Sequence, residues 1–208
     1  TILEVNTSTV GVRNPPEPAQ KPNETTSTVT TNSTSSTTRV EAPYRDPLAQ
    51  SFTVDETGAF LAAVDVYFGR KATDNKKLFV ELRTVELGTP TKWLVQDYAQ
   101  VTLNPENINL SPDASIPTKI TFPSPIYLEP KKEYALVFLS PGSVEYEMWI
   151  AEMGKNNVTP PTGLPATTDD STTGQITKQY LGGSLFKSQN GSIWTPTQKQ
   201  DLKFTLYK

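Results

Sequence analysis

Chemistry in this 208-residue sequence must come from carboxylates, lysines or tyrosines, because the chain contains no Cys and no His. That absence excludes Ser-His-Asp and Cys-His triads, and also the zinc and haem sites that rely on those ligands. A glycosidase would place two carboxyl groups about 5 to 10 Å apart across a cleft, and a carboxylate hydrolase is kept as a third hypothesis. The sequence does not pair its candidates, most of which fall in turns or at outward strand positions, so we expect no enzyme. The candidates are Asp55, Glu56, Asp65, Glu81, Asp97, Glu145 and Glu147.

Metal and cofactor chemistry has little support in the sequence. Asp169, Asp170 and Ser171 could contribute to a calcium site, which needs six or more oxygen ligands. No segment resembles an EF-hand loop, and Gly182–Gly183 is typical of a bend at a strand end rather than of a phosphate-binding loop. We therefore expect no metal site and no cofactor.

Three tryptophans are the candidate contact residues of this sequence. Trp149 lies out of phase with Met148 and Ile150, so we expect it to point away from their apolar face. Trp93 lies within the segment TPTKWLVQDY, and Trp194 follows an expected hairpin. Exposed aromatic side chains stack on sugar rings or fill a pocket of a partner. The alternative is that all three tryptophans are buried near the edges of a β core.

The elements that would position these residues are strands. Alternation over residues 60–68 predicts a strand whose buried face carries Phe60, Val64 and Phe68, with Asp65 on the opposite face. Residues 134–139 are apolar on both faces, as expected of a central strand. Further strands are expected around residues 49–52, 78–82, 120–122, 146–150 and 202–206.

Turn signals separate the expected strands. Asp74–Asn75 and Asn190–Gly191 favour tight turns, and Pro123 is expected to end the strand at 120–122. Helical periodicity is confined to one possible turn at 111–116. Eight or so short strands joined by Pro- and Gly-bearing turns predict an all-β domain over residues 44–208, with the fold of a jelly-roll-like β-sandwich.

Residues 1–43 have a different composition and are predicted to form an extended arm or linker. In residues 25–38, twelve of the fourteen residues are Ser or Thr, which leaves almost no apolar surface to offset the entropy of ordering. Prolines 15, 16, 18 and 22 favour extended geometry. The β-branched residues of segment 1–12 are suited to adding a strand to the sheet of a partner. We expect a neighbouring chain to order this arm.

The charge balance and the lengths of the apolar runs argue against nucleic acids and membranes as partners. Nineteen basic and twenty-two acidic residues give a net charge of −3, which is unlike the basic footprint of a nucleic-acid-binding protein. No apolar run approaches the roughly 20 residues of a membrane helix, so we expect no membrane insertion. Residues 155–175 form a long polar segment, for which contact with a partner is the natural use.

Three segments together resemble a module found in virion proteins of tailed bacteriophages. These are AQSF at Ala49–Phe52, SPIYLEP with EYALV within Ser124–Val137, and SQNGS through DLKFTLY within Ser188–Tyr207. The sequence is most similar to large tail or baseplate-associated proteins of T4-like myoviruses, including those of cyanophages. The resemblance covers residues 46–208, about three quarters of the chain. It implies a virion location and a structural role, and it implies nothing catalytic.

The leading hypothesis from sequence is a non-enzymatic component of a phage tail or baseplate. Its arm and loops would contact other virion protein chains. The alternative is a carbohydrate-binding module that recognises host surface glycans through Trp93, Trp149 or Trp194. An exposed row of aromatic side chains with polar neighbours would favour the second hypothesis.

Overall fold

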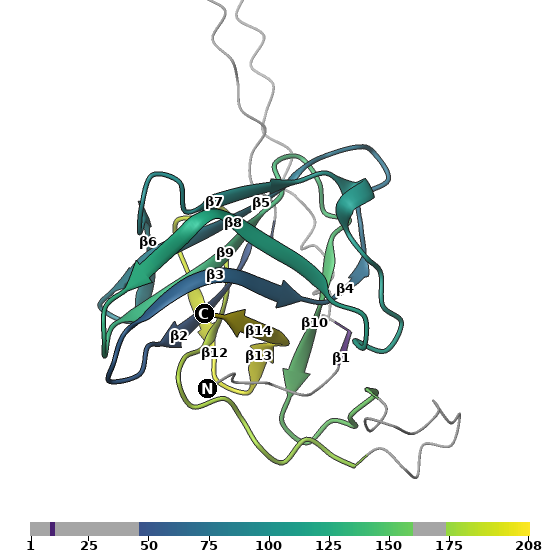
Figure 1. The fold of residues 1–208 in the computed structure, drawn as a ribbon. Helices are drawn as coiled ribbons and strands as arrows, with labels where there is room; N and C mark the ends of the chain where they lie inside the picture. Colours follow the sequence, from purple (N-terminus) through teal and green to yellow (C-terminus); the bar gives the residue numbers. More distant parts are fainter. Residues whose placement is uncertain (1–8, 11–45, 160–173) are drawn as a thin grey trace, which may run out of the picture.

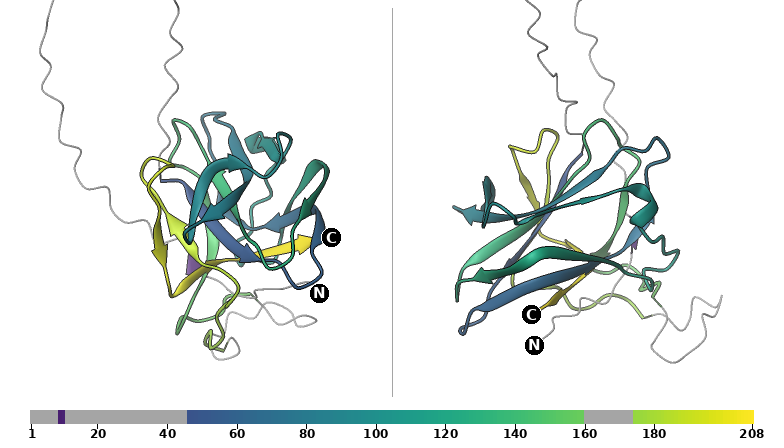
Figure 2. Two further views of the ribbon diagram at one scale, coloured as in Figure 1. Left: turned by 90° about the vertical axis from the view of Figure 1, so that its left-hand side faces the viewer. Right: turned by 45° about the horizontal axis from the view of Figure 1, so that its top comes forward.

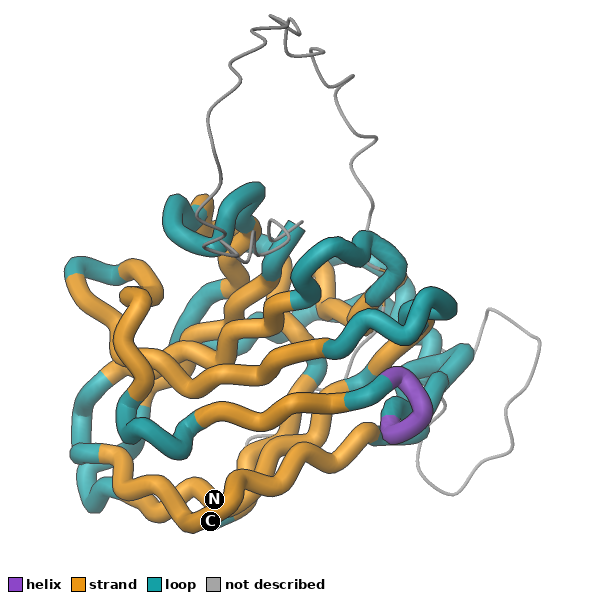
Figure 3. The backbone as a smooth tube through the Cα atoms, turned by 90° about the horizontal axis from the view of Figure 1, so that it is seen from above, coloured by secondary structure: helices purple, strands orange, loops and turns teal. Residues whose placement is uncertain are grey.

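The computed structural model describes residues 9–10, 46–159 and 174–208, and these residues form strands and one 3-10 turn (Figure 1). No α-helix occurs in them, and none of their helical segments is long and apolar enough to cross a membrane. The strands are β1 Thr9–Val10, β2 Leu48–Thr53, β3 Ala59–Val66, β4 Phe68–Arg70, β5 Leu78–Glu86, β6 Thr89–Leu94, β7 Gln100–Leu103, β8 Thr118–Leu128, β9 Glu133–Leu139, β10 Glu147–Glu152, β11 Leu185–Lys187, β12 Thr195–Thr197, β13 Gln200–Leu202 and β14 Phe204–Tyr207. The 3-10 turn is Pro105–Asn107, purple in Figure 3.

The named strands build three antiparallel sheets. The largest has the order β12-β11-β2-β9-β5-β6, with β7 also paired to β5. A three-stranded sheet has the order β14-β3-β8, and a third sheet joins β1, β10, β13 and β4. Figures 1 and 2 show β3 and β8 lying across from the strands of the largest sheet. The all-β prediction is therefore confirmed at the level of strands and sheets.

One hydrophobic core lies between these sheets. Val64 and Ile120 from the three-stranded sheet pack in the same cluster as Leu82 and Leu136 from the largest sheet. Strand β9 is central, between β2 and β5, and its residues 134–139 are all buried, as predicted. Both faces of such a strand are covered, which explains its continuous apolar run.

Phe60 does not lie on the buried face, and the prediction for it was wrong. Its side chain is 59% exposed, whereas Val64 and Phe68 are fully buried as predicted. Leu61 pairs with Ile126 and Ala63 pairs with Thr121, so one residue of β3 faces four residues of β8. This bulge shifts the alternation of β3. Before it the odd-numbered Leu61 faces the core, and after it the even-numbered Val64 and Val66 do. Leu61 is therefore buried in place of Phe60.

Asp65 is buried rather than exposed, which corrects a second expectation about the same strand. The hydroxyl of Tyr207 donates a hydrogen bond of 2.6 Å to Asp65 Oδ2. Tyr207 belongs to β14, which pairs with β3 along its whole length. The face of β3 that points away from the core is thus covered by side chains of its neighbouring strand.

Pro123 does not end its strand, contrary to the prediction. Strand β8 continues through Pro123 and Pro125 to Leu128. It is the edge of the three-stranded sheet, so its outer side needs no amide donors. Both prolines also lie in the stretch that bulges opposite Ala62.

The turn predictions have mixed outcomes. Strands β11 and β12 form a hairpin around Asn190–Gly191, and Gly191 has a positive φ of 71°, as a turn glycine requires. The seven intervening residues make this a longer loop than a two-residue turn. Residues 111–116 form bends, and the helical turn lies instead at Pro105–Asn107.

Close approach of two chain segments requires a glycine at 183. A Cβ atom at that position would overlap the carbonyl of Ser51 in β2. Ser51 N–H donates to the carbonyl of Ser184 at 2.9 Å, and the hydroxyl of Thr53 donates to that of Gly182 at 2.8 Å. The predicted bend at Gly182–Gly183 therefore serves to attach this segment to β2.

Most of the predicted arm, residues 1–43, lies outside the described residues.

Candidate functional site

Trp93 is the exposed member of the three candidate tryptophans. It lies in β6 and is 61% exposed. The ammonium of Lys92 stands 4.6 Å from the centroid of its ring, a cation–π contact. Its ring is available to a partner.

Trp149 points away from the Met148 and Ile150 face, as predicted, but its ring is buried. Its indole Nε1–H donates a hydrogen bond of 2.7 Å to the carbonyl of Ser111. It packs with Tyr67 and Ala114 in a small apolar cluster. The loop around residue 111 thus covers a side chain that the strand pattern alone would leave exposed.

Trp194 is buried on the outer face of the largest sheet. It packs with Ala49, Val137 and Phe186, whose side chains all lie on that face. Trp149 and Trp194 belong to different apolar clusters, so the structure does not bring the three tryptophans together. Stacking of a ligand on either buried ring would require that ring to leave its cluster.

A different group of aromatic residues is exposed side by side. Phe60 and Tyr127 pair across β3 and β8, with ring centroids 5.1 Å apart and Tyr127 47% exposed. The hydroxyl of Tyr98, also exposed, lies 3.4 Å from the carbonyl of Pro125, two residues before Tyr127. We call Phe60, Tyr98 and Tyr127 the aromatic ledge.

The aromatic ledge borders a cleft of about 440 Å³. The end of β5, the segment after β6, and the hairpin that joins β8 to β9 form its walls. Tyr127 belongs to both the ledge and the cleft. The lining residues are Thr84, Val85, Glu86, Val95, Gln96, Tyr127, Glu129, Lys132, Glu133 and Tyr134.

The charge of the cleft lining is negative. It holds the carboxylates of Glu86, Glu129 and Glu133 and a single ammonium, that of Lys132. Lys132 Nζ lies 2.7 Å from Glu129 Oε2, and this hydrogen bond raises the pKa of Lys132. The one cation is therefore already paired, and the cleft is suited to neutral or cationic ligands.

Sequence reasoning missed this site. Its residues come from four separate segments, and Phe60 was assigned to the core because the bulge at Ala62 was not foreseen. The available signal was the pair of prolines at 123 and 125, since prolines within a strand pattern mark an edge or a bulge.

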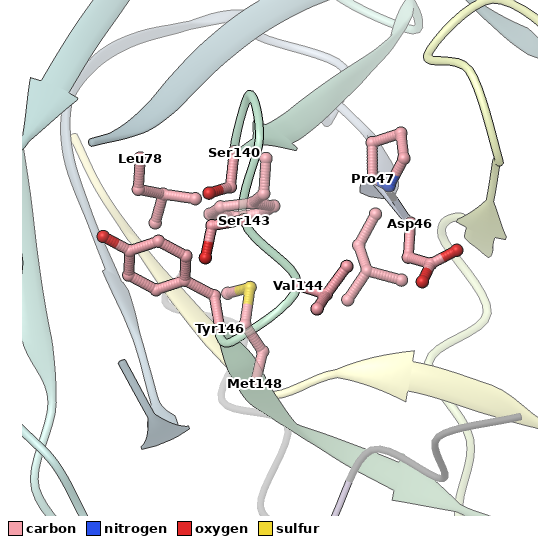
Figure 4. A pocket seen from close by; sticks show the side chains of 10 residues that line it. Asp46, Pro47, Leu78, Ser140, Ser143, Val144, Tyr146 and Met148 are labelled. Atoms are coloured by element: carbon pink, nitrogen blue, oxygen red, sulfur yellow. The ribbon is translucent and has the colours of Figure 1, made fainter. Parts of the chain in front are cut away.

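A second cavity, of about 50 Å³, lies beside the start of β2 (Figure 4). Leu78, Val144, Tyr146 and Met148 are among its lining side chains. Ser140 Oγ is buried there and has no hydrogen-bond partner among the described residues. A cavity of this size holds a few water molecules at most, so it is too small for a sugar ring or a cofactor.

Two exposed candidate carboxylates, Asp55 and Glu56, have structural partners. Asp55 accepts hydrogen bonds from Lys208 Nζ and from the hydroxyl and amide of Thr57, and these lower its pKa to about 2. Glu56 lies 3.3 Å from Lys131, and Asp97 is exposed near Tyr98 in sequence. The lowered pKa keeps Asp55 in its charged form.

Three further candidates lie near arginines, whereas Asp65 is hydrogen-bonded to Tyr207. Glu81 lies 2.6 Å from Arg83 on the outer face of the largest sheet. Glu145 and Glu147 lie 3.8 and 3.7 Å from Arg70. Hydrogen bonds from the amide and hydroxyl of Thr73 lower the pKa of Glu145. Among the described residues, no three metal-ligating side chains cluster, and the proposed calcium ligands at 169–171 lie outside that part of the chain.

Asp201 is a buried carboxyl that sequence reasoning did not single out. Burial raises its pKa to about 6, although Gln50, Gln179 and the amide of Tyr180 all donate hydrogen bonds to it. Gln50 also accepts a hydrogen bond of 2.8 Å from the amide of Leu202. This network joins β2 to β13 inside the protein.

The edge of β10 accepts a strand from the N-terminal segment. Thr9 pairs with Ile150 and Val10 with Trp149. The amide of Trp149 donates to Tyr67 and its carbonyl accepts from Lys203, so both groups face β4 and β13. Because backbone groups alternate along a strand, those of Ile150 face β1. Strand β1 therefore occupies the edge of β10 that lies opposite β4 and β13.

No protein-family model matches the chain, and no curated protein is significantly similar to it.

Proposed function

We propose that this chain is a non-enzymatic structural component of a phage tail or baseplate, with other virion proteins as its partners. In this proposal the body is a jelly-roll-like β-sandwich, and the N-terminal arm and the surface loops hold it in the particle. The observation that carries the proposal is the pairing of β1 with β10. That pairing supports a role of the N-terminal segment in adding a strand to a sheet edge.

The same pairing can form between copies. Backbone hydrogen bonds do not distinguish an arm of the same chain from that of a neighbour. In sequence, 35 residues (11–45) lie between β1 and the body. In a particle, neighbouring subunits would bring the β1 segment of one copy close to the β10 edge of another, so pairing between copies would compete with pairing within one chain.

Deletion of residues 1–43 tests the arm. The deleted protein should keep its cooperative unfolding but fail to enter particles. A full-length control with Thr9→Pro should be partly impaired, because proline removes the amide that pairs with Ile150. Normal incorporation of the deleted protein would overturn the proposal.

A carbohydrate-binding module is the second candidate function. The aromatic ledge beside a polar cleft favours it, since this is the arrangement of exposed rings and polar neighbours that sugar recognition uses. Trp93 is the one sequence-predicted contact residue that is exposed. Glycan binding by the folded protein that persists when residues 1–43 are deleted would support this function independently of the arm.

A further inference from the structure

We propose that the cleft between β5–β6 and the β8–β9 hairpin binds a neutral saccharide, with Tyr127 as the stacking platform. The inference rests on the second function proposed above, and it names the site and the ligand class. The volume of the cleft, about 440 Å³, lies within the range of roughly 300 to 1,000 Å³ that small-molecule sites occupy.

Tyr127 has the features of a preorganised platform. Its ring is about half exposed and packs at 50° against the ring of Phe60. Its hydroxyl lies 3.2 Å from the position that a Cβ atom of Gly58 would take, so the glycine leaves room for the tyrosine. Because neighbours already orient the ring, little side-chain entropy is lost when a sugar stacks on it.

Two polar side chains line the cleft together with Tyr127. In the part of the chain that the structure describes, the side chains of Gln96 and Glu133 make no hydrogen bond, although both line the cleft. A carboxylate accepts hydrogen bonds from sugar hydroxyls, and an amide both donates and accepts them. An aromatic ring with such groups beside it matches a pyranose, which has an apolar face and a rim of hydroxyls.

The charge of the site selects among saccharides. Lys132 is paired with Glu129, so the cleft offers no free ammonium to an acidic sugar, and Glu86 and Glu133 would repel one. Like-charge contacts of this kind reject a ligand. Neutral hexoses and N-acetylhexosamines remain, whereas sialylated and uronate-containing glycans are disfavoured.

The experiment is saturation-transfer NMR with the full chain and a defined panel. Maltotriose, cellotriose and triacetylchitotriose are the neutral probes, and sialyllactose is the acidic probe. We expect at least one neutral probe to bind and sialyllactose to bind more weakly. Tyr127→Ala should weaken binding roughly tenfold, and Tyr127→Phe should retain it because the ring is kept.

Matched variants separate the cleft from other surfaces. Gln96→Ala and Glu133→Ala should each weaken binding, while Ile193→Ala, at an exposed position that does not line the cleft, should leave it unchanged. Thermal melts of each variant show whether it is folded, and Tyr127→Phe keeps the test valid if Tyr127→Ala unfolds. Loss of binding in Trp93→Ala but not in the cleft variants would overturn the cleft site and leave the carbohydrate function standing. Absence of binding by every neutral probe, or preference for sialyllactose, would overturn the inference, and absence of all binding would overturn the carbohydrate function too.

Discussion

At the scale of single residues, the buried carboxyl group of Asp201 makes the stability of the fold depend on pH. Asp201 is almost completely buried and is held by hydrogen bonds from Gln50, Gln179 and the amide of Tyr180. Three donors favour its charged form, but loss of water outweighs them, and its pKa is about 6 instead of 3.8. The protonation of Asp201 is therefore coupled to folding.

The first prediction concerns pH. Between about pH 4 and 6 the native protein holds a proton on Asp201 that the unfolded chain releases, so this group stabilises the fold as pH falls through 6 toward 4. Its contribution decreases as pH rises to 6 and is constant above. Across this pH range, the contribution of Asp201 to the free energy of unfolding should change by about 1–3 kcal/mol. Carboxyls with lowered pKa, such as Asp55 and Glu145, act in the opposite direction.

Chemical unfolding of wild type and Asp201→Asn from pH 4 to 8 isolates this group. The difference in unfolding free energy between wild type and variant should shift in favour of wild type as pH is lowered from 7 to 4. Parallel stability curves across the whole range would show that Asp201 is not the group responsible.

The second prediction concerns Phe68 and Phe60. Phe68 is fully buried and packs edge-on against Tyr146, so Phe68→Ala should cost about 3–5 kcal/mol. Phe60 is exposed and contacts Tyr127, so Phe60→Ala should cost no more than about 1.5 kcal/mol. Urea unfolding of both variants measures the contrast. Equal effects at the two positions would contradict the register of β3.

At the scale of elements, irregular strands shape both the body and the cleft. The bulge between β3 and β8 turns Phe60 outward beside Tyr127, and the prolines of β8 are tolerated because that strand is an edge. On the other side of the molecule, residues 182–184 lie against β2 through backbone contacts. Each of these features depends on how two strands meet.

The third prediction tests the contact at Gly183. Gly183→Ala places a methyl group against the backbone of Ser51, so it should destabilise the protein by roughly 1–3 kcal/mol. Gly174→Ala is the matched control, since a Cβ atom there meets no atom of the described residues within 4 Å. Thermal melting of the two variants gives the comparison. A Gly183→Ala protein as stable as the control would show that β2 and the 182–184 segment are not in contact.

At the scale of the whole molecule, the described residues of 46–159 and 174–208 build three apolar clusters among themselves. Leu202 and Phe204 from the C-terminal strands share the main cluster with Phe52 from the first long strand. Of the N-terminal segment, the described part adds only the short strand β1 at an edge. The body should therefore be stable without the arm.

The fourth prediction follows from this distribution of the core. A protein of residues 44–208 should unfold cooperatively and melt within a few degrees of the full chain, because it keeps these three clusters and the described part of the removed segment contributes a two-residue ladder. Circular dichroism of both proteins provides the measurement. Loss of cooperative unfolding on truncation would mean that the arm is part of the folded body.

The sequence by itself determined the strand content and the central strand. Period-two alternation and apolar runs report local structure, and residues 134–139 and the Asn190–Gly191 hairpin were predicted on that basis. The absence of Cys and His also bounded the chemistry without any structure. These properties depend on residues close together in the chain, which is why the sequence is sufficient for them.

Only the tertiary structure decided which side chains are exposed together. The bulge opposite Ala62 depends on a count of residues in two strands, and it moved Phe60 from the core to the surface. Distant loops and strands covered Trp149 and Trp194, and the burial of Asp201 raised its pKa. The cleft likewise combines segments that lie far apart in sequence. Burial and electrostatics arise from non-local packing, so a local pattern predicts a strand but not what covers each of its faces.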